Sequence, residues 1–182
     1  PIAADSVSIA AGVSVRVNIN SACAYLSLIK PTGTANTVLN VLTGITFGVT
    51  GNIQINGNGL SANSILMLSG TAILNASADI ILSANTAGTA VVNLTGGASM
   101  LNLGGNLTLN TAGTLSGGSS STVTLNGSSA QTLNLSAGIS YKHLSFNNSS
   151  GVTLGGAVTP ANVTGNITIA SGTLNSGGFN MN

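Results

Sequence analysis

Few side chains in this sequence can perform acid–base or nucleophilic chemistry. The candidates are two acids, three bases, one histidine and one cysteine: Asp5, Asp79, Arg16, Lys30, Lys142, His143 and Cys23. Hydrolysis of a glycosidic bond needs two carboxylates flanking that bond, and we expect Asp5, in a flexible terminal segment, to lie far from Asp79. A pairing of His143 with Ser140 or Ser145 lacks an acid to orient the imidazole, and adjacent strand residues point to opposite faces. We therefore predict no catalytic residue and interpret the protein as a non-enzyme.

The sequence also contains few side chains that could bind a metal ion or a cofactor. Zinc usually takes four Cys, His or acidic ligands, and calcium takes six to eight oxygens, many of them from carboxylates. We predict no metal and no cofactor. Cys23 has no intramolecular partner, so it is expected to be a small buried apolar residue or, alternatively, to form an intermolecular disulfide. An isopeptide bond from Lys30 or Lys142 to an asparagine, assisted by Asp79, is a further alternative.

The charge content limits the partners of the chain. Charged residues make up 3% of the sequence and the formal net charge is +1, against roughly 25% charged residues in typical soluble domains. Binding to nucleic acid needs a basic patch, so we exclude it. No apolar run has the roughly 18 residues of a membrane helix, so we predict no membrane insertion. Proteins near neutrality tend to associate, which favours contacts between copies of the chain.

Alternation of apolar and polar residues with a period of two predicts an all-β protein. It is longest near the N-terminus, where apolar residues occupy odd positions: Val7, Ile9, Ala11, Val13, Val15, Val17 and Ile19. Shorter segments of the same kind end at Gly, Asn or Ser, which favour turns. They contain Ile45–Val49, Ile53–Ile55, Leu107–Leu109, Val123–Leu125, Leu133–Leu135, Leu144–Phe146, Val152–Leu154 and Ile167–Ile169.

Two short units recur along the chain. Gly-Asn-apolar-x-apolar begins at Gly51, Gly105 and Gly165, and small-Gly-Thr-apolar begins at Ser69, Ala87, Ala112 and Ser171. Such repetition is typical of a solenoid. The spacing of the first unit suggests coils of about 18 to 20 residues, hence roughly nine coils in a stack some 40 Å long. We predict a right-handed parallel β-helix-like solenoid, with a β-sandwich as the alternative.

No convincing domain boundary interrupts the chain. The Gly117–Ser121 segment has the composition of a linker, but similar strands flank it on both sides, so we interpret it as a corner. We therefore predict one β-rich repeat domain over residues 1–182. Within it, residues 1–19 are a candidate N-terminal assembly strand, formed by Val7, Ile9, Val13, Val15, Val17 and Ile19.

The C-terminal third resembles a known group of repeats. Its matching positions are Tyr141 to Leu144, Phe146 to Asn148, Gly151 to Leu154, Gly165 to Ile169 and Ser171 to Leu174. They resemble repeats of large secreted, cell-surface β-solenoid or adhesin-like proteins of Bacteroidota, over about 60 residues from Thr122 onward. The resemblance implies a β-solenoid located outside the cell, as a mature product or a fragment, and implies no catalytic residue.

These observations lead to a functional hypothesis with one alternative. The leading hypothesis is a non-enzymatic extracellular structural subunit that assembles head-to-tail into a filament, with copies of itself as partners. Its first strand would form the first coil or would be donated into the groove of a neighbour. The alternative is an adhesin or carbohydrate-binding passenger module of a larger surface protein, with glycans or cell surfaces as partners.

Overall fold

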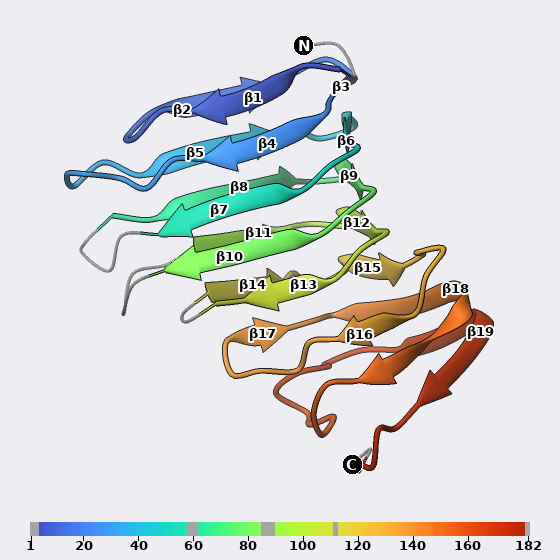
Figure 1. The fold of residues 1–182 in the computed structure, drawn as a ribbon. Coiled ribbons are helices and arrows are strands. Elements are labelled where there is room, and N and C mark those ends of the chain that lie inside the picture. The colour runs from blue at the N-terminus through green and yellow to red at the C-terminus, as the bar shows by residue number, and fades with distance from the viewer. Residues whose placement is uncertain (1–3, 58–61, 85–89, 111–112, 181–182) are drawn as a thin grey trace.

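Three parallel β-sheets of five, six and eight strands form the three faces of a stack of turns (Figure 1). The computed structural model describes residues 4–57, 62–84, 90–110 and 113–180. Within those ranges the chain contains strands, turns and no helix. The all-β prediction is confirmed and the fold is a β-solenoid. The β-sandwich alternative is wrong, because all the ladders between strands are parallel, whereas a sandwich is built from antiparallel sheets.

Each turn contributes one strand to each face. Face 1 contains β1 (Ser6–Ile9), β4 (Tyr25–Leu28), β7 (Ile53–Gly57), β10 (Ile80–Ala84) and β13 (Leu107–Leu109). Face 2 contains β2 (Ser14–Val17), β5 (Thr37–Val41), β8 (Ser64–Ser69), β11 (Ala90–Gly96), β14 (Gly113–Gly117) and β17 (Ile139–Ser140). Face 3 contains β3 (Ser21–Cys23), β6 (Thr46–Val49), β9 (Ile73–Ala76), β12 (Met100–Leu103), β15 (Thr122–Leu125) and the first part of β18 (His143–Leu154). β16 (Gln131–Leu133) pairs with the second part of β18, and β19 (Ile167–Asn175) pairs with both parts.

The turns are longer and fewer than the sequence repeats suggested. Ile53, Ile80 and Leu107 pair in succession, so a central turn takes 27 residues, and β1 to β18 form about six turns. The prediction of roughly nine coils of about 20 residues is therefore wrong. The Gly51 and Gly105 units lie two turns apart on face 1. The Gly165 unit begins β19, which continues face 3 instead. The spacing between the three units therefore compared positions on two different faces and gave too short a turn.

Inward-facing residues stack into columns that form the core. On face 1, Leu26, Ile53, Ile80 and Leu107 lie directly above one another and are at most 5% exposed. Equivalent columns run along faces 2 and 3, and one continuous apolar cluster joins all three faces. Each buried Leu or Ile of such a column contributes about 1.5–3 kcal/mol by leaving water. The alternation read from the sequence is the alternation between this core and the outer surface.

The long alternating segment near the N-terminus forms two strands instead of one. β1 and β2 are separated by a turn at Gly12, whose φ of 72° favours glycine. The amide of Gly12 donates to Oγ1 of Thr37, and the amide of Val13 donates to the carbonyl of Ala10 at 3.1 Å. The prediction of a single strand over Val7–Ile19 is therefore wrong, and residues 1–3 of the proposed assembly segment lie outside the described residues. The two strands form faces 1 and 2 of the first turn.

Face 1 is interrupted between β13 and β16. In the central turns three residues form the corner between face 3 and face 1, as between Ala76 and Ile80, but five separate Leu125 from Gln131. β16 consequently pairs only with β18, and no ladder joins it to β13 in the part of the chain that the structure describes. Face 3 continues without a break from β12 through β15 to β18. The two extra corner residues thus produce a seam on one face only.

Candidate functional site

The predicted assembly residues gather at the N-terminal end of the stack. A cavity of about 360 Å³ opens there, and five of the six predicted residues line it: Val7, Ile9, Val15, Val17 and Ile19. Phe47 and Leu39 of the second turn form its floor together with Ser21 of the first. The sixth predicted residue, Val13, lies at the turn beside Gly12, is 43% exposed and does not line the cavity.

This cavity exists because the first turn fills the core columns incompletely. Ser21 stands above Phe47 at the start of one of the two inward columns of face 3, where a larger apolar residue would close the end of the core. Val7, Val15 and Val17 stand above Leu26, Leu39 and Val41 and are only partly buried, whereas the three residues below them are at most 2% exposed. Ile19 is 69% exposed. The N-terminal end therefore presents apolar core positions to solvent.

The C-terminal end of the described chain also exposes core positions. Ile167 and Ile169 of β19 continue the face 3 columns below Leu144 and Phe146. Leu144 and Phe146 are each 1% exposed, but Ile167 is 38% exposed and Ile169 is 52% exposed. Alternation in the sequence predicted this strand but not its exposure, because exposure depends on which residues lie in the last described turn.

The residues considered for catalysis take structural roles at the corners between turns. Oδ1 of Asp79 accepts the backbone amide of Asn106, one turn later, at 2.7 Å. Asn52 accepts the amide of Asp79 in the same way at 3.3 Å, and Nδ1 of His143 accepts the amide of Asn166 at 3.1 Å. Such bonds satisfy backbone donors that the corner leaves without a ladder partner. Asp79 thus occupies a position that asparagine takes in the turn before it.

Cys23 and Tyr141 are buried groups whose charged forms are disfavoured. Cys23 is fully buried and has a free thiol, which agrees with the expectation of a buried apolar residue; an intermolecular disulfide would require this turn to open. Burial raises the pKa of the Cys23 thiol above its ordinary value. Burial also raises the pKa of the Tyr141 hydroxyl, which donates to the carbonyl of Asn134 at 2.9 Å. Both groups are therefore neutral in the folded protein near pH 7.

A cluster of buried amides fills the widened corner beside the seam. Gln131 and Asn148 are 3% and 1% exposed, respectively. Oε1 of Gln131 accepts the amide of Gly127 at 2.8 Å and Nδ2 of Asn148 at 2.9 Å, while its Nε2 donates to the carbonyls of Leu103 and Gly105. No pattern in the sequence predicted this cluster. Gln131 is one of two glutamines in the chain, and its position at the start of a strand gave no indication of burial.

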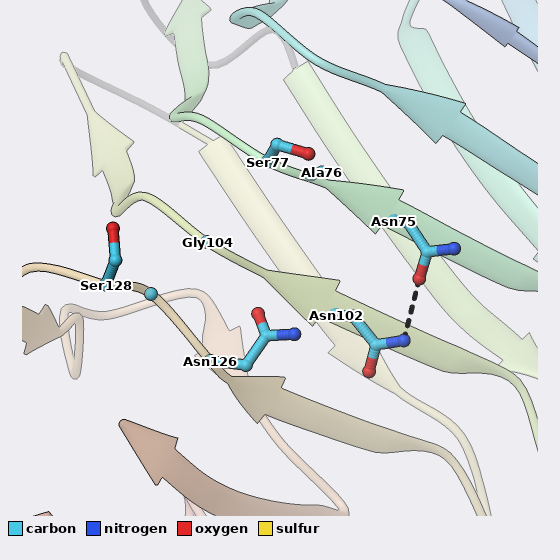
Figure 2. Close-up of a pocket in the computed structure, with 8 residues that line it drawn as sticks. Asn75, Ala76, Ser77, Asn102, Gly104, Asn126 and Ser128 are labelled. Atoms are coloured by element: carbon cyan, nitrogen blue, oxygen red, sulfur yellow. Dashed lines mark hydrogen bonds between the residues drawn. The ribbon is translucent and has the colours of Figure 1, made fainter. Parts of the chain in front are cut away.

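A polar hollow of about 340 Å³ lies on the outside of face 3, next to the same corner (Figure 2). It is lined by Asn75, Ala76, Ser77, Asn102, Gly104, Asn126, Gly127 and Ser128. Nδ2 of Asn102 donates to Oδ1 of Asn75, in the adjacent turn, at 2.8 Å, the bond drawn in Figure 2. None of the lining residues is charged. Amide and hydroxyl groups there can donate and accept hydrogen bonds, but they supply no acid, base or metal ligand set.

Comparisons of the chain with protein-family models, with curated proteins and with solved structures found no match. The described residues contain no group of three or more His, Cys, Asp or Glu side chains close enough to hold a metal ion. They also contain no helix of the length and apolar character needed to cross a membrane. The two ends of the solenoid and the polar hollow are the candidate functional sites among the described residues.

Proposed function

We propose that this protein is a non-enzymatic, extracellular structural subunit that assembles head-to-tail with copies of itself into a filament. The observation that carries the proposal is the exposure of Ile167 and Ile169, which occupy core columns in the last described turn. In a solenoid such positions are covered by packing against a neighbouring turn, and a second copy of the chain can supply that turn. The extracellular location is supported by the low charge content and by the resemblance of the C-terminal repeats to secreted surface proteins.

The partner fitted by this end is the opposite end of a second copy. Face 3 ends in β19 and begins in β3, and both strands alternate inward and outward residues in the same phase. Parallel pairing of β19 with β3 of the next copy would place Ile167 over Ser21 and Ile169 over Cys23. The small Ser21 in the floor of the N-terminal cavity leaves room for the Ile167 side chain. Such a contact is heterologous and open, so it produces a filament instead of a closed ring.

Charge does not oppose this contact. Residues 164–180, which include β19, contain no charged side chain, and Arg16 is the single charged residue among those lining the N-terminal cavity. Burial of apolar surface is then the main driving force, at roughly 25 cal/mol per Å². Main-chain groups of β3 and β19 that no other described strand pairs would add hydrogen bonds of the kind formed in strand addition.

The proposal is tested by making the C-terminal end polar. We expect Ile167→Asn combined with Ile169→Asn to abolish the filaments that the unmodified chain forms. The measurements are negative-stain electron microscopy and sedimentation velocity over a range of protein concentrations. The matched control combines Met100→Asn with Ile29→Asn, because these two side chains are 38% and 40% exposed and lie in the interior turns of the stack.

Two results would contradict the proposal. The first is that the unmodified chain remains monomeric at high concentration. The second is that the Met100/Ile29 control loses assembly as completely as the Ile167/Ile169 variant. The second result would indicate lateral association through the sides of the stack. Circular dichroism and thermal unfolding of each variant establish that it is folded before its assembly is compared.

A carbohydrate-binding passenger module is the second candidate function. The observation that favours it is the uncharged hollow lined by asparagine and serine on face 3. Sugar-binding surfaces commonly also offer aromatic rings, and no aromatic residue lines this hollow. A module of this kind would remain monomeric in the sedimentation experiment, so the oligomeric state of the unmodified chain distinguishes the two functions.

A further inference from the structure

The hollow on face 3 is enforced by the backbone at Gly104. The amide of Gly104 donates to the carbonyl of Ala76 at 2.7 Å, and the amide of Asn126 donates to the carbonyl of Leu103 at 3.0 Å. These bonds place Ser77, Gly104 and Asn126 in one column, with the glycine in the middle. A Cβ atom at position 104 would lie 2.6 Å from the carbonyl oxygen of Ser77. The hollow therefore cannot be filled by a side chain at this position without moving the backbone.

The rim of the hollow presents amides in a fixed arrangement. The bond from Nδ2 of Asn102 to Oδ1 of Asn75 orients both side chains and leaves an amide donor on Asn75 and an acceptor on Asn102. Asn126 is exposed, and its side chain makes no hydrogen bond to any other residue that the structure describes. In Figure 2, Asn126 and Ser128 lie on the turn that follows the one carrying Asn102 and Gly104.

We propose that this hollow binds an uncharged glycan, an inference that is independent of head-to-tail assembly. A sugar hydroxyl both donates and accepts hydrogen bonds, and each carboxamide offers two donors and an acceptor. Asn75 and Asn126 offer amide donors, and Asn102 and Asn126 offer amide acceptors. Donors and acceptors arranged side by side suit neighbouring hydroxyls of one sugar ring. The uncovered backbone of Gly104 allows the ring to approach closely.

The electrostatics of the hollow select among ligands. No residue that lines it carries a charge, so a sulfate, phosphate or carboxylate group would lose hydration without gaining an ion pair. A neutral hydroxyl-rich chain loses less on entering. Because no aromatic ring stacks on the sugar, affinity depends on the amide hydrogen bonds, and removing one of them should have a large effect.

The test uses the full chain and an array of neutral and sulfated glycans, followed by isothermal titration calorimetry with the neutral glycan that binds best. We expect binding to neutral glycans, with Asn126→Ala and Asn102→Ala each weakening it at least tenfold. The control is Asn40→Ala on face 2. Asn40 is half-buried like Asn102, and its side chain also bonds to the neighbouring turn: Asn40 accepts from Oγ of Ser69 at 2.8 Å, whereas Asn102 donates to Asn75.

Three results would overturn the inference. The first is that no neutral glycan on the array binds, and the second is that sulfated glycans alone bind. The third is that the Asn40→Ala control weakens binding as much as Asn126→Ala does. Asn126→Ala removes an exposed side chain that makes no intramolecular hydrogen bond within the described residues, so we expect it to fold normally. Matching thermal unfolding curves for this variant and the unmodified chain confirm that a loss of binding is local.

Discussion

At the scale of single residues, side-chain acceptors and donors complete the hydrogen bonding that the turns leave open. Asn52, Asp79 and His143 accept backbone amides of the following turn at the corners. Each of them occupies a geometric position that recurs in every turn. The hydrogen bond to the next turn therefore accounts for a polar side chain at that position. A buried amide such as Gln131 does the same for a corner that differs from the others.

Gln131 provides the sharpest stability prediction. Gln131→Leu leaves the amide of Gly127 and the carbonyl of Gly105 without their side-chain partner inside the protein, and a buried unpaired group costs about 1–3 kcal/mol. We expect the free energy of unfolding in urea to fall by about 2–3 kcal/mol. The control is Gln54→Leu, since Gln54 is only half-buried and bonds to Asn56 and Ser83 on the outer surface. Equal losses in the two variants would contradict the role of Gln131.

The raised pKa values of Cys23 and Tyr141 predict loss of stability in alkaline solution. Each group stays neutral in the folded protein and ionises more readily in the unfolded chain, so its contribution is complete below its unfolded pKa. Stability should be constant from neutral pH to about pH 8 and fall above about pH 9, first through Cys23 and then through Tyr141. Urea unfolding of Cys23→Ala measured at pH 7 and pH 10 checks this. The variant should lose less stability between those pH values than the unmodified chain does.

At the scale of elements, the seam between β13 and β16 separates two stretches of face 1. Side chains bridge it: Oδ1 of Asn106 accepts the amide of Thr132 at 2.8 Å, and Nδ2 of Asn134 donates to the carbonyl of Leu107 at 3.0 Å. Elsewhere on face 1 a continuous backbone ladder performs this function, as between β7 and β10. The turns on either side remain joined through face 3.

Hydrogen exchange should locate the seam. We expect backbone amides of residues 132–135 to exchange at least tenfold faster than those of residues 80–83, because exchange follows local opening and the seam lacks a ladder. Mass spectrometry of peptides covering the two segments measures the difference. Equal protection would show that the bridging side chains hold face 1 as firmly as a backbone ladder does.

At the scale of the whole molecule, a solenoid has two ends, and both described ends of this one expose apolar core positions. Ile167 and Ile169 at one end and the cavity above Phe47 at the other are the matching surfaces of the proposed filament. Stacking would extend every core column from one copy into the next. The columns would then be covered along their whole length except at the two tips of the filament.

The turn count fixes the axial repeat expected of that filament. About six turns spaced by 4.8 Å give a repeat of about 30 Å per subunit, shorter than the 40 Å derived from the repeat spacing. Electron microscopy of assembled material should show this repeat, and a repeat far from 30 Å would contradict end-to-end stacking.

Assembly should hardly change when the salt concentration is raised, because few charges are present. Sedimentation velocity at low and high salt measures this, and filaments that dissociate at high salt would contradict a contact formed mainly by apolar surface.

Much of this architecture is determined locally by the sequence. Alternation such as Val123–Leu125 or Ile53–Ile55 identifies inward positions, since successive side chains of a strand point to opposite sides. The low charge content and scarcity of acids likewise exclude whole classes of site before any folding is considered. The β-solenoid prediction follows from the alternation together with the recurring Gly-Asn and Gly-Thr units.

Other features depend on which residues meet across a turn, and only the tertiary structure decides those. The Gly12 turn divides Val7–Ile19 because its amide reaches Thr37, 25 residues later. Two extra corner residues before Gln131 create the seam, and the column that contains Gly104 creates the polar hollow. Alternation specifies whether a side chain points inward, but the register between turns specifies what lies above and below it. That register is set by the summed packing of distant strands, which no short segment of sequence contains.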